Sequence, residues 1–174
     1  MNYGEIKPYD IANGLGVRVS IFVSGCKNHC QNCFNQITWD FNYGQEFNQE
    51  TLNQLIKLLE PSYIAGLSIL GGEPLEPENQ AGILDLIKQI KTIYPKKTIW
   101  LYSGFTYEEL TNFIPSRAAT PLITDILSLI DVLVDGRFIE ELKDISLQFR
   151  GSTKQRLIDV KRTLQTNRVI TLEL

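Results

Sequence analysis

Apolar residues along this chain follow two different periods, which alternate from one segment to the next. The segment Gly16–Gly25 reads GVRVSIFVSG, with an apolar side chain at every second position, as expected for a β-strand with one buried face. Three later apolar runs have the length and the flanking turn residues of further strands. These runs are Tyr63–Leu70, Lys97–Gly104 and Asp131–Gly136.

Between the predicted strands, apolar residues recur every three or four positions, which is typical of helices that bury one face. Pro77 suits the first turn of one helix, and Thr106 with Glu109 three residues later predicts a capping box for another. The predicted helices are Gln49–Glu60, Pro77–Tyr94, Thr106–Phe113 and Pro121–Ile130. A polar loop at residues 149–156 and a tail with two strand-like pieces, 156–160 and 168–174, complete the pattern.

Strands that alternate with helices predict an α/β fold, in which helices cover a parallel sheet. Right-handed crossovers curl such a sheet toward a barrel. A full eight-stranded barrel takes about 250 residues, and this chain has 174. We therefore predict an open, partial β/α barrel with a mostly parallel sheet and covering helices, in a single domain over residues 1–174.

Each of the four predicted strands is followed by a short polar motif. The motifs are the cysteine-rich segment Ser24–Gln36, then Gly-Gly-Glu-Pro, Tyr-Ser-Gly and Asp-Gly-Arg. Active sites in folds of this kind lie at the carboxyl ends of the strands. We therefore expect the four motifs to open onto the same end of the sheet.

Composition and charge exclude several kinds of partner. The chain carries 17 Lys and Arg against 20 Asp and Glu, a net charge of −3, and so lacks the basic excess of a nucleic-acid-binding protein. No apolar run reaches the ~20 residues of a membrane helix, and the first ten residues lack the basic and apolar regions of a signal peptide. The sequence predicts a cytoplasmic protein with neither a nucleic acid nor a membrane as partner.

All three cysteines and the only histidine of the chain lie within eight residues, in the order Cys26, His29, Cys30, Cys33. Three interpretations are open. The thiols are small buried apolar groups. They bind zinc, with His29 as the fourth ligand, although neighbouring residues of a chain point in different directions. Or they hold a 4Fe–4S cluster, which normally has four cysteine ligands, so that one iron is left for a non-protein ligand.

The C-x3-C-x2-C segment after the first strand resembles the one found in radical S-adenosylmethionine (SAM) enzymes. The resemblance implies a 4Fe–4S cluster bound by Cys26, Cys30 and Cys33, with SAM chelated to the open iron. It also implies that Asn32, Cys33 and the aromatic Phe34 border the SAM pocket.

The GGEP stretch after the second strand, whose residues are Gly71, Gly72, Glu73 and Pro74, is similar to the family segment that binds the SAM amino group. Glycines let a backbone approach a ligand closely, and a carboxylate suits a cationic amine. Without the resemblance, the stretch is equally well explained as a turn that ends a strand.

Polar residues after the later strands complete the implied site. Ser103, after the third strand, is a candidate to hydrogen-bond the ribose or carboxylate of SAM, or is a plain turn serine. Asp135 and Arg137 follow the fourth strand, where related activases place polar residues against SAM, although a turn also explains Asp135 and Gly136. Arg18 is a weaker candidate, as a cation that pairs with a carboxylate near the site. The loop from Arg150 to Arg156 is implied to dock a protein partner, or is simply a solvated basic loop. His29 is interpreted as a polar spacer, and the tryptophans as core or cluster-shielding residues.

Longer segments narrow the resemblance to glycyl-radical-enzyme activases. The stretches NGLGVRVSIFVSGC, WLYSGFTYEEL, DVLVDGRF and FRGSTKQRLIDV together resemble the activating proteins of anaerobic (class III) ribonucleotide reductases, with Leu15 in place of a usual proline and Thr153-Lys154 in place of Ser-Asn. The resemblance implies a radical SAM oxidoreductase. The reduced cluster cleaves SAM to methionine and a 5′-deoxyadenosyl radical, and that radical abstracts hydrogen from a glycine of the partner enzyme. The implied partners are the large subunit of the anaerobic ribonucleotide reductase and a flavodoxin-type electron donor.

Two alternatives are kept. In the first, the chain activates a different glycyl-radical enzyme or is another kind of radical SAM enzyme. In the second, it is a non-catalytic module that binds zinc or carries electrons. The second alternative has no use for GGEP, and an electron carrier normally has four cluster cysteines.

Overall fold

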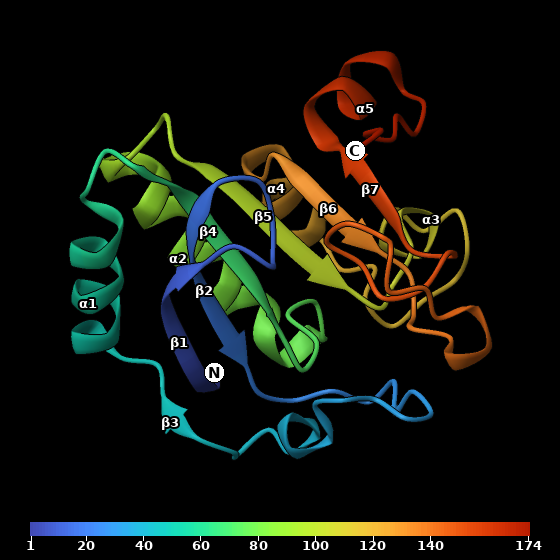
Figure 1. Ribbon diagram of the computed structural model, residues 1–174, viewed down its shortest axis with the longest axis horizontal. Coiled ribbons are helices and arrows are strands. Elements are labelled where there is room, and N and C mark those ends of the chain that lie inside the picture. Colours follow the sequence, from blue (N-terminus) through green and yellow to red (C-terminus); the bar gives the residue numbers. More distant parts are fainter.

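The computed structural model describes residues 1–174 and is built on one open seven-stranded sheet (Figure 1). The strand order is β3-β1-β2-β4-β5-β6-β7. The strands are β1 (Asn2–Asp10), β2 (Val17–Val23), β3 (Gln45–Glu46), β4 (Ile64–Gly71), β5 (Thr98–Ser103), β6 (Val132–Asp135) and β7 (Arg156–Asp159). The helices are α1 (Gln49–Leu59), α2 (Pro77–Ile93), α3 (Tyr107–Leu110), α4 (Leu122–Leu129) and α5 (Val160–Thr166), with short 3₁₀ turns η1 (Gln36–Trp39) and η2 (Glu140–Leu142).

The central strands β2, β4, β5 and β6 pair in parallel, and they are the four strands that the sequence predicts. The expected open α/β architecture is therefore confirmed. The expectation of a mostly parallel sheet holds only for this centre, because β1, β3 and β7 all pair antiparallel. An antiparallel edge strand is common on an otherwise parallel sheet.

Three elements were not predicted, namely β1, β3 and α5. Strand β1 has Gly4, Pro8 and several charged residues, and only two of its nine positions are buried, so it shows little apolar alternation. Because β3 pairs only with Asn2 and Tyr3, the rest of β1 is a free edge of the sheet, and proline and charge are typical of such edges, where they discourage pairing with other chains. Of the two strand-like pieces expected in the tail, 156–160 forms β7, whereas 168–174 contributes only a single bridge, between Thr171 and Ile158, and α5 lies between the two pieces.

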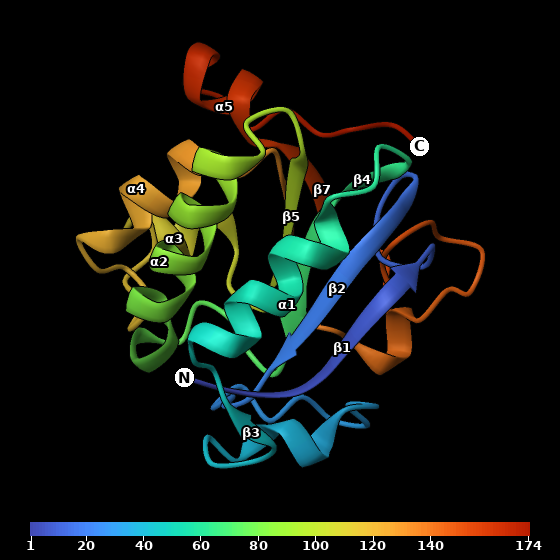
Figure 2. The same cartoon turned by 90° about the vertical axis from the view of Figure 1, so that its left-hand side faces the viewer.

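One face of the sheet carries the main core. Figure 2 shows α1, α2 and α4 together on this face, where 28 buried side chains form a continuous cluster. The α1 stripe of Leu52, Leu55 and Leu59 is buried as its helical spacing predicts. The predicted capping box at Thr106 and Glu109 is also present. Helices on this face join the amino end of each parallel strand to the carboxyl end of the one before, and this places the connecting loops at the strand ends.

The other face of the sheet is covered by a long connecting segment rather than by α-helices. The segment between β6 and β7 lies against it (Figure 2), where the Phe149 ring meets Trp100 edge to face at 5.4 Å. Val132, Val134 and Leu157 are buried beside them. No helix of the structure is long and apolar enough to cross a lipid bilayer.

Arg18 is buried inside this face and closes the amino end of the parallel strands. Its guanidinium donates to the Ser68 and Thr98 hydroxyls at 2.7 and 2.9 Å and to the Leu67 and Thr98 carbonyls at 2.9 Å, and it lies 5.4 Å from the centre of the Trp100 ring. Burial lowers the pKa of Arg18 to about 10, so the side chain stays charged at neutral pH. The expectation that Arg18 binds a carboxylate near the site is wrong, because its guanidinium is hydrogen-bonded to hydroxyls and carbonyls of β4 and β5.

Replacing Arg18 with Ala should therefore weaken the fold strongly. The substitution leaves a cavity and several buried acceptors without a donor, so the free energy of unfolding should fall by roughly 3–5 kcal/mol. Chemical denaturation measures this change. The exposed Arg162→Ala should change stability by less than about 0.5 kcal/mol, and an equal effect of both substitutions would contradict the role given to Arg18.

Candidate functional site

The carboxyl ends of β2, β4, β5 and β6 meet at one end of the sheet, where the four arrows of Figure 1 point toward the cysteine segment. A pocket lies there, and all four expected motifs contribute to it. Its walls include all three cysteines, Gly71–Glu73 after β4, Ser103 and Gly104 after β5, and Gly136 after β6. The parallel pairing thus brings together motifs that are up to 110 residues apart, from Cys26 to Gly136.

The cysteine segment enters the pocket as an irregular loop tied to its neighbours through the backbone. Gly25 N–H donates to the Thr38 carbonyl at 2.7 Å, and Cys26 N–H donates to the Trp39 carbonyl at 3.1 Å. His29 stacks on the Trp39 ring, with ring centres 4.3 Å apart. Its imidazole is therefore packed as a spacer in the loop wall.

The three thiols border one pocket without converging on a single point. All are free, with Cys26 buried and the other two half-buried, and all line the same pocket. Nowhere in the chain do three His, Cys, Asp or Glu side chains converge closely enough to hold one metal ion. A 4Fe–4S cluster places each thiolate on a different iron, so the sulfurs have only to surround it.

Burial keeps the thiols of Cys26 and Cys30 protonated until a cation binds beside them. It raises the pKa of Cys26 to about 11 and also raises the pKa of Cys30. Metal ligation requires the thiolate, and a bound cation supplies the charge that makes deprotonation favourable. The same burial protects the thiols from reaction with solvent.

The Glu73 carboxylate is fully buried and joins three of the four motifs. It accepts four hydrogen bonds, two at each oxygen: from Ser103 Oγ at 2.8 Å, Leu75 N at 2.9 Å, Gly104 N at 2.7 Å and Asn28 Nδ2 at 3.1 Å. Buried charge is costly unless every lone pair is satisfied. The carboxylate therefore holds the cysteine segment, the GGEP turn and the end of β5 in one arrangement.

Burial raises the pKa of Glu73 to about 7, against the lowering effect of these donors, and the nearby Glu76 charge adds to the rise. The group is thus balanced between charged and neutral forms at neutral pH. A cation placed in the pocket favours the carboxylate form.

Gly71 and Gly72 allow the GGEP turn to pass against the cysteine segment. Gly71 has φ +116°, a conformation that side chains disfavour. A Cβ at Gly72 would lie 2.7 Å from the carbonyl oxygens of both Gly25 and Thr38. Gly72 N–H also donates to the Val23 carbonyl at 2.8 Å, so the backbone approach is direct.

The remaining predicted pocket residues are distributed as follows. Ser103 lines the pocket, but its hydroxyl already donates to Glu73 and accepts from the Phe105 N–H. Phe34 stands at the mouth and is 91% exposed, which leaves its ring free to cover a ligand. Asn32 lines an adjoining cavity, and its φ of 54° suits asparagine. Pro74 is buried in the turn and is not among the lining residues.

Asp135 and Arg137 lie beside the pocket without lining it. The fully buried Asp135 accepts from Arg156 Nε at 2.9 Å and from Tyr107 N–H at 2.7 Å. Arg137 pairs with Glu109 at 3.2 Å. Both side chains therefore tie loops around the pocket together.

The loop from Arg150 to Arg156 is not uniformly solvated. Arg156 binds Asp135 and Glu108, and these partners raise its pKa further. The Arg150 Nε is buried with no hydrogen-bond partner. Gln155 of this loop lines the pocket.

Several lining residues were not among the individual candidates, namely Asn28, Phe138, Gln155 and Tyr102, the last of which entered only as part of the Tyr-Ser-Gly motif. Tyr102 could have been found, because it is two positions after Trp100 on the same face of β5 and directly precedes the Ser-Gly turn. The others are on irregular segments, where no periodicity indicates which way a side chain points.

Comparison with known proteins supports the chemistry of the cysteine segment. Residues 12–158 match the family model described as a 4Fe-4S single cluster domain. The chain is 42% identical over 157 residues to a Vibrio cholerae protein and 43% identical to one from Escherichia coli K12, in each case over 89% of this chain and 96% of the relative. A protein of Enterobacteria phage T4 is 38% identical, over 90% and 93%. All three relatives are named anaerobic ribonucleoside-triphosphate reductase-activating protein.

Adding a single methyl group at Gly72 should disturb the site. The Cβ of Gly72→Ala meets two backbone carbonyls that cannot move independently of the cysteine segment, so stability should fall by about 1–3 kcal/mol. Gly82→Ala on α2 is the matched control, because its Cβ meets only the Met1 side chain. That control should be neutral or stabilising by up to about 1 kcal/mol. Thermal or denaturant unfolding compares the two, and equal behaviour would show that the close approach is not restrictive.

Glu73 should also give stability a measurable pH dependence. Its pKa lies at about 7 in the folded chain, above the ordinary 4.5, so the unfolded chain loses this proton first as the pH rises. The stability contributed by Glu73 is fully present below about pH 4.5 and is lost by pH 7, a change of roughly 3 kcal/mol at most.

Glu73→Gln removes this titration, so the metal-free, reduced variant should lose less stability between pH 5 and 7.5 than the unchanged chain. Denaturant unfolding at both pH values measures the difference. Parallel pH profiles for the two proteins would show that Glu73 does not titrate in this range.

Proposed function

Because this chain belongs to the 4Fe-4S single cluster domain family and to the anaerobic ribonucleoside-triphosphate reductase-activating proteins within it, we propose that it is a glycyl-radical-enzyme activase acting on such a reductase. When bound, a 4Fe–4S cluster and SAM supply the chemistry, namely reductive cleavage of SAM to methionine and a 5′-deoxyadenosyl radical that takes hydrogen from a glycine of the reductase. The observation that carries the proposal is the meeting of three thiols and the Glu73-centred turn in one pocket.

Cys26, Cys30 and Cys33 hold the cluster as thiolates. They line the pocket from one segment, and the cluster offsets the burial that otherwise keeps Cys26 and Cys30 protonated. The apolar walls around them, which include Phe22, Leu70 and Val134, keep water from the reacting centre.

The GGEP turn positions the methionine end of SAM. Gly71, Gly72 and Pro74 shape the turn, and Glu73 supplies a negative charge for the amino group. Of the four donors on Glu73, Asn28 at 3.1 Å makes the longest bond, and an ammonium can take its place. Positioning of this kind is the main contribution of a protein whose cofactors carry the bond chemistry.

The other predicted residues frame the nucleoside end. Phe34 and Asn32 border the pocket mouth, and Ser103 fixes Glu73 from β5. Asp135 and Arg137 act indirectly, by holding the ends of β6 and α3 in place through Arg156 and Glu109. The proposal thus separates residues that contact SAM from those that place the loops.

A partial barrel of the radical SAM type, in a single domain over residues 1–174, is supported by four parallel strands whose carboxyl ends share one pocket. A flavodoxin-type protein supplies the electron. Three free thiols suit a reducing, cytoplasmic compartment.

The deciding experiment uses anaerobically reconstituted protein, reduced with dithionite and given SAM, with and without a class III reductase. We expect about four irons per chain, as a 4Fe–4S cluster contains, together with 5′-deoxyadenosine and a glycyl radical signal on the reductase. Iron and cleavage without that signal would point to a different substrate. Bound zinc with no cleavage of SAM would contradict the proposal.

Cys30→Ala should abolish cluster assembly and SAM cleavage together, because two thiolates cannot hold the cluster. Iron content and 5′-deoxyadenosine are the readouts, and Ser128→Ala, exposed on α4, is the control that should match the unchanged chain. A Cys30→Ala variant that kept a full cluster would contradict the ligand assignment.

A further inference from the structure

A second set of contacts reaches the cysteine segment from a part of the chain that no motif marks. Arg117 lies between α3 and α4, and its side chain makes three hydrogen bonds toward the site. Its Nε and Nη2 donate to the two carboxylate oxygens of Glu76 at 2.9 and 2.7 Å, and Nη2 also donates to Asn28 Oδ1 at 2.9 Å. One guanidinium therefore joins the start of α2 to the cysteine segment.

Both partners of Arg117 make further hydrogen bonds at the site. Glu76 is fully buried, and its Oε1 also accepts from the backbone N–H of Lys27 at 2.8 Å. Asn28 donates its Nδ2 to Glu73 at 3.1 Å. Arg117 thus holds the two residues that follow Cys26, one through Glu76 and the other directly.

These bonds fall where the cysteine segment has few other supports. Lys27 and Asn28 make four hydrogen bonds to other segments through their own or their partners' side chains. The next residue, His29, is held by its stacking on Trp39. Arg117 therefore acts on the first part of the stretch that leads from Cys26 to Cys30.

Arg117 is itself held in place. Its guanidinium packs 4.6 Å from the centre of the buried Phe105 ring. The next residue, Ala118, accepts at its carbonyl from the buried Gln80 side chain at 2.9 Å. A planar guanidinium fixed in this way can bond Glu76 and Asn28 at once, which a single ammonium cannot do with the same geometry.

We propose that Arg117 is a positioning residue for the cysteine segment, which it orders through Glu76 and Asn28 before any cofactor binds. The inference rests on the proposed function only in naming a 4Fe–4S cluster as the group that the ordered thiols receive. The ordering itself belongs to the metal-free chain and can be tested there.

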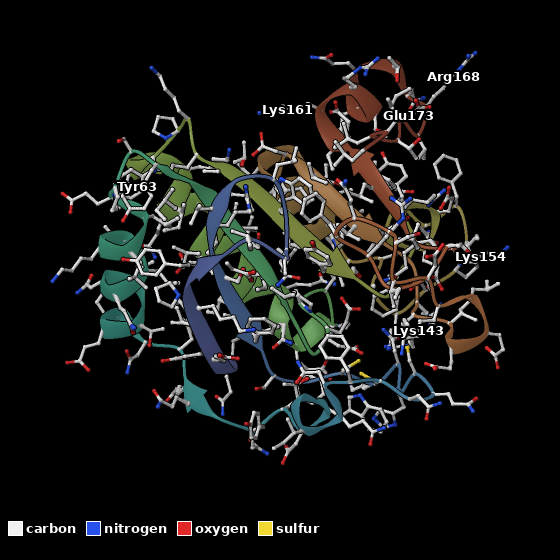
Figure 3. All side chains as sticks on the ribbon, in the orientation of Figure 1. Tyr63, Lys143, Lys154, Lys161, Arg168 and Glu173 are labelled. Atoms are coloured by element: carbon white, nitrogen blue, oxygen red, sulfur yellow. The ribbon has the colours of Figure 1, made fainter.

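The test is hydrogen–deuterium exchange of the reduced, metal-free chain, read at the amides of residues 26–35. Arg117→Gln should speed exchange at Lys27 by about tenfold, because Glu76, the acceptor of the Lys27 amide, is no longer held. In Arg117→Lys, the Lys27 amide should also exchange faster than in the unchanged chain. Lys161→Gln is the matched control, since Lys161 also pairs with a largely buried carboxylate, that of Asp131, but lies on α5 at the opposite end of the molecule (Figure 3).

Unchanged exchange at Lys27 in Arg117→Gln would overturn the inference, and so would an equal increase in the Lys161→Gln control. Should Arg117→Gln fail to fold, Arg117→Lys provides the second variant, because it keeps the charge but cannot bond Glu76 and Asn28 at once with the same geometry. Unchanged exchange at Lys27 in that variant would overturn the inference.

The cluster gives an independent readout. After anaerobic reconstitution, Arg117→Gln should lose iron to a chelator about tenfold faster than the unchanged chain, as changes behind metal ligands commonly do. Faster exchange with equal iron retention would limit Arg117 to the metal-free chain and overturn its role toward the cluster. If the unchanged chain bound no cluster at all, the proposed function would fail while the exchange result still decided the ordering role.

Discussion

The parallel pairing of β2, β4, β5 and β6 is the constraint on which the rest of this structure depends. Pairing brings Val23 opposite Gly71 and Ser103 opposite Asp135, so the strands end nearly level. The loops that follow them can then share one pocket. Because side chains alternate along a strand, a slip of one residue would exchange the faces on which Tyr102 and Ser103 lie and so disrupt the site.

Within that frame, one buried carboxylate sets how the loops meet. Glu73 draws donors from three motifs, and its burial is tolerated because all four of its hydrogen-bonding positions are filled. Glycines stand where the loops come closest: Gly72 faces the backbone at Gly25 and Thr38, and Gly104 lies beside Glu73 and Asn28. Tight backbone packing and a satisfied charge thus act together at the same point.

Around the pocket, ion pairs replace the apolar core as the means of fixing loops. Arg117, Arg137 and Arg156 each join a loop at this end of the sheet to a carboxylate of another element, while the main core lies between the sheet and α1, α2 and α4. Loops need exposed polar surface, so a large apolar contact is not open to them. A planar guanidinium with several donors can hold two loops while burying little area. The site is therefore rigid at its base, where the strands end, and is ordered by charge at its rim.

The local sequence was enough to predict the four parallel strands, the helices Gln49–Glu60 and Pro77–Tyr94, and the capping box at Thr106, because apolar period and cap chemistry are properties of neighbouring residues. It also predicted that the cysteine, GGEP, Ser103 and Asp135 motifs follow strand ends. Only the tertiary structure decided that Arg18 closes the opposite end of the strands, that Asp135 turns to Arg156, and that Arg117 reaches Asn28 across 89 residues. A side chain's partners depend on which distant segments the fold brings beside it, and that information is absent from the spacing of residues along the chain.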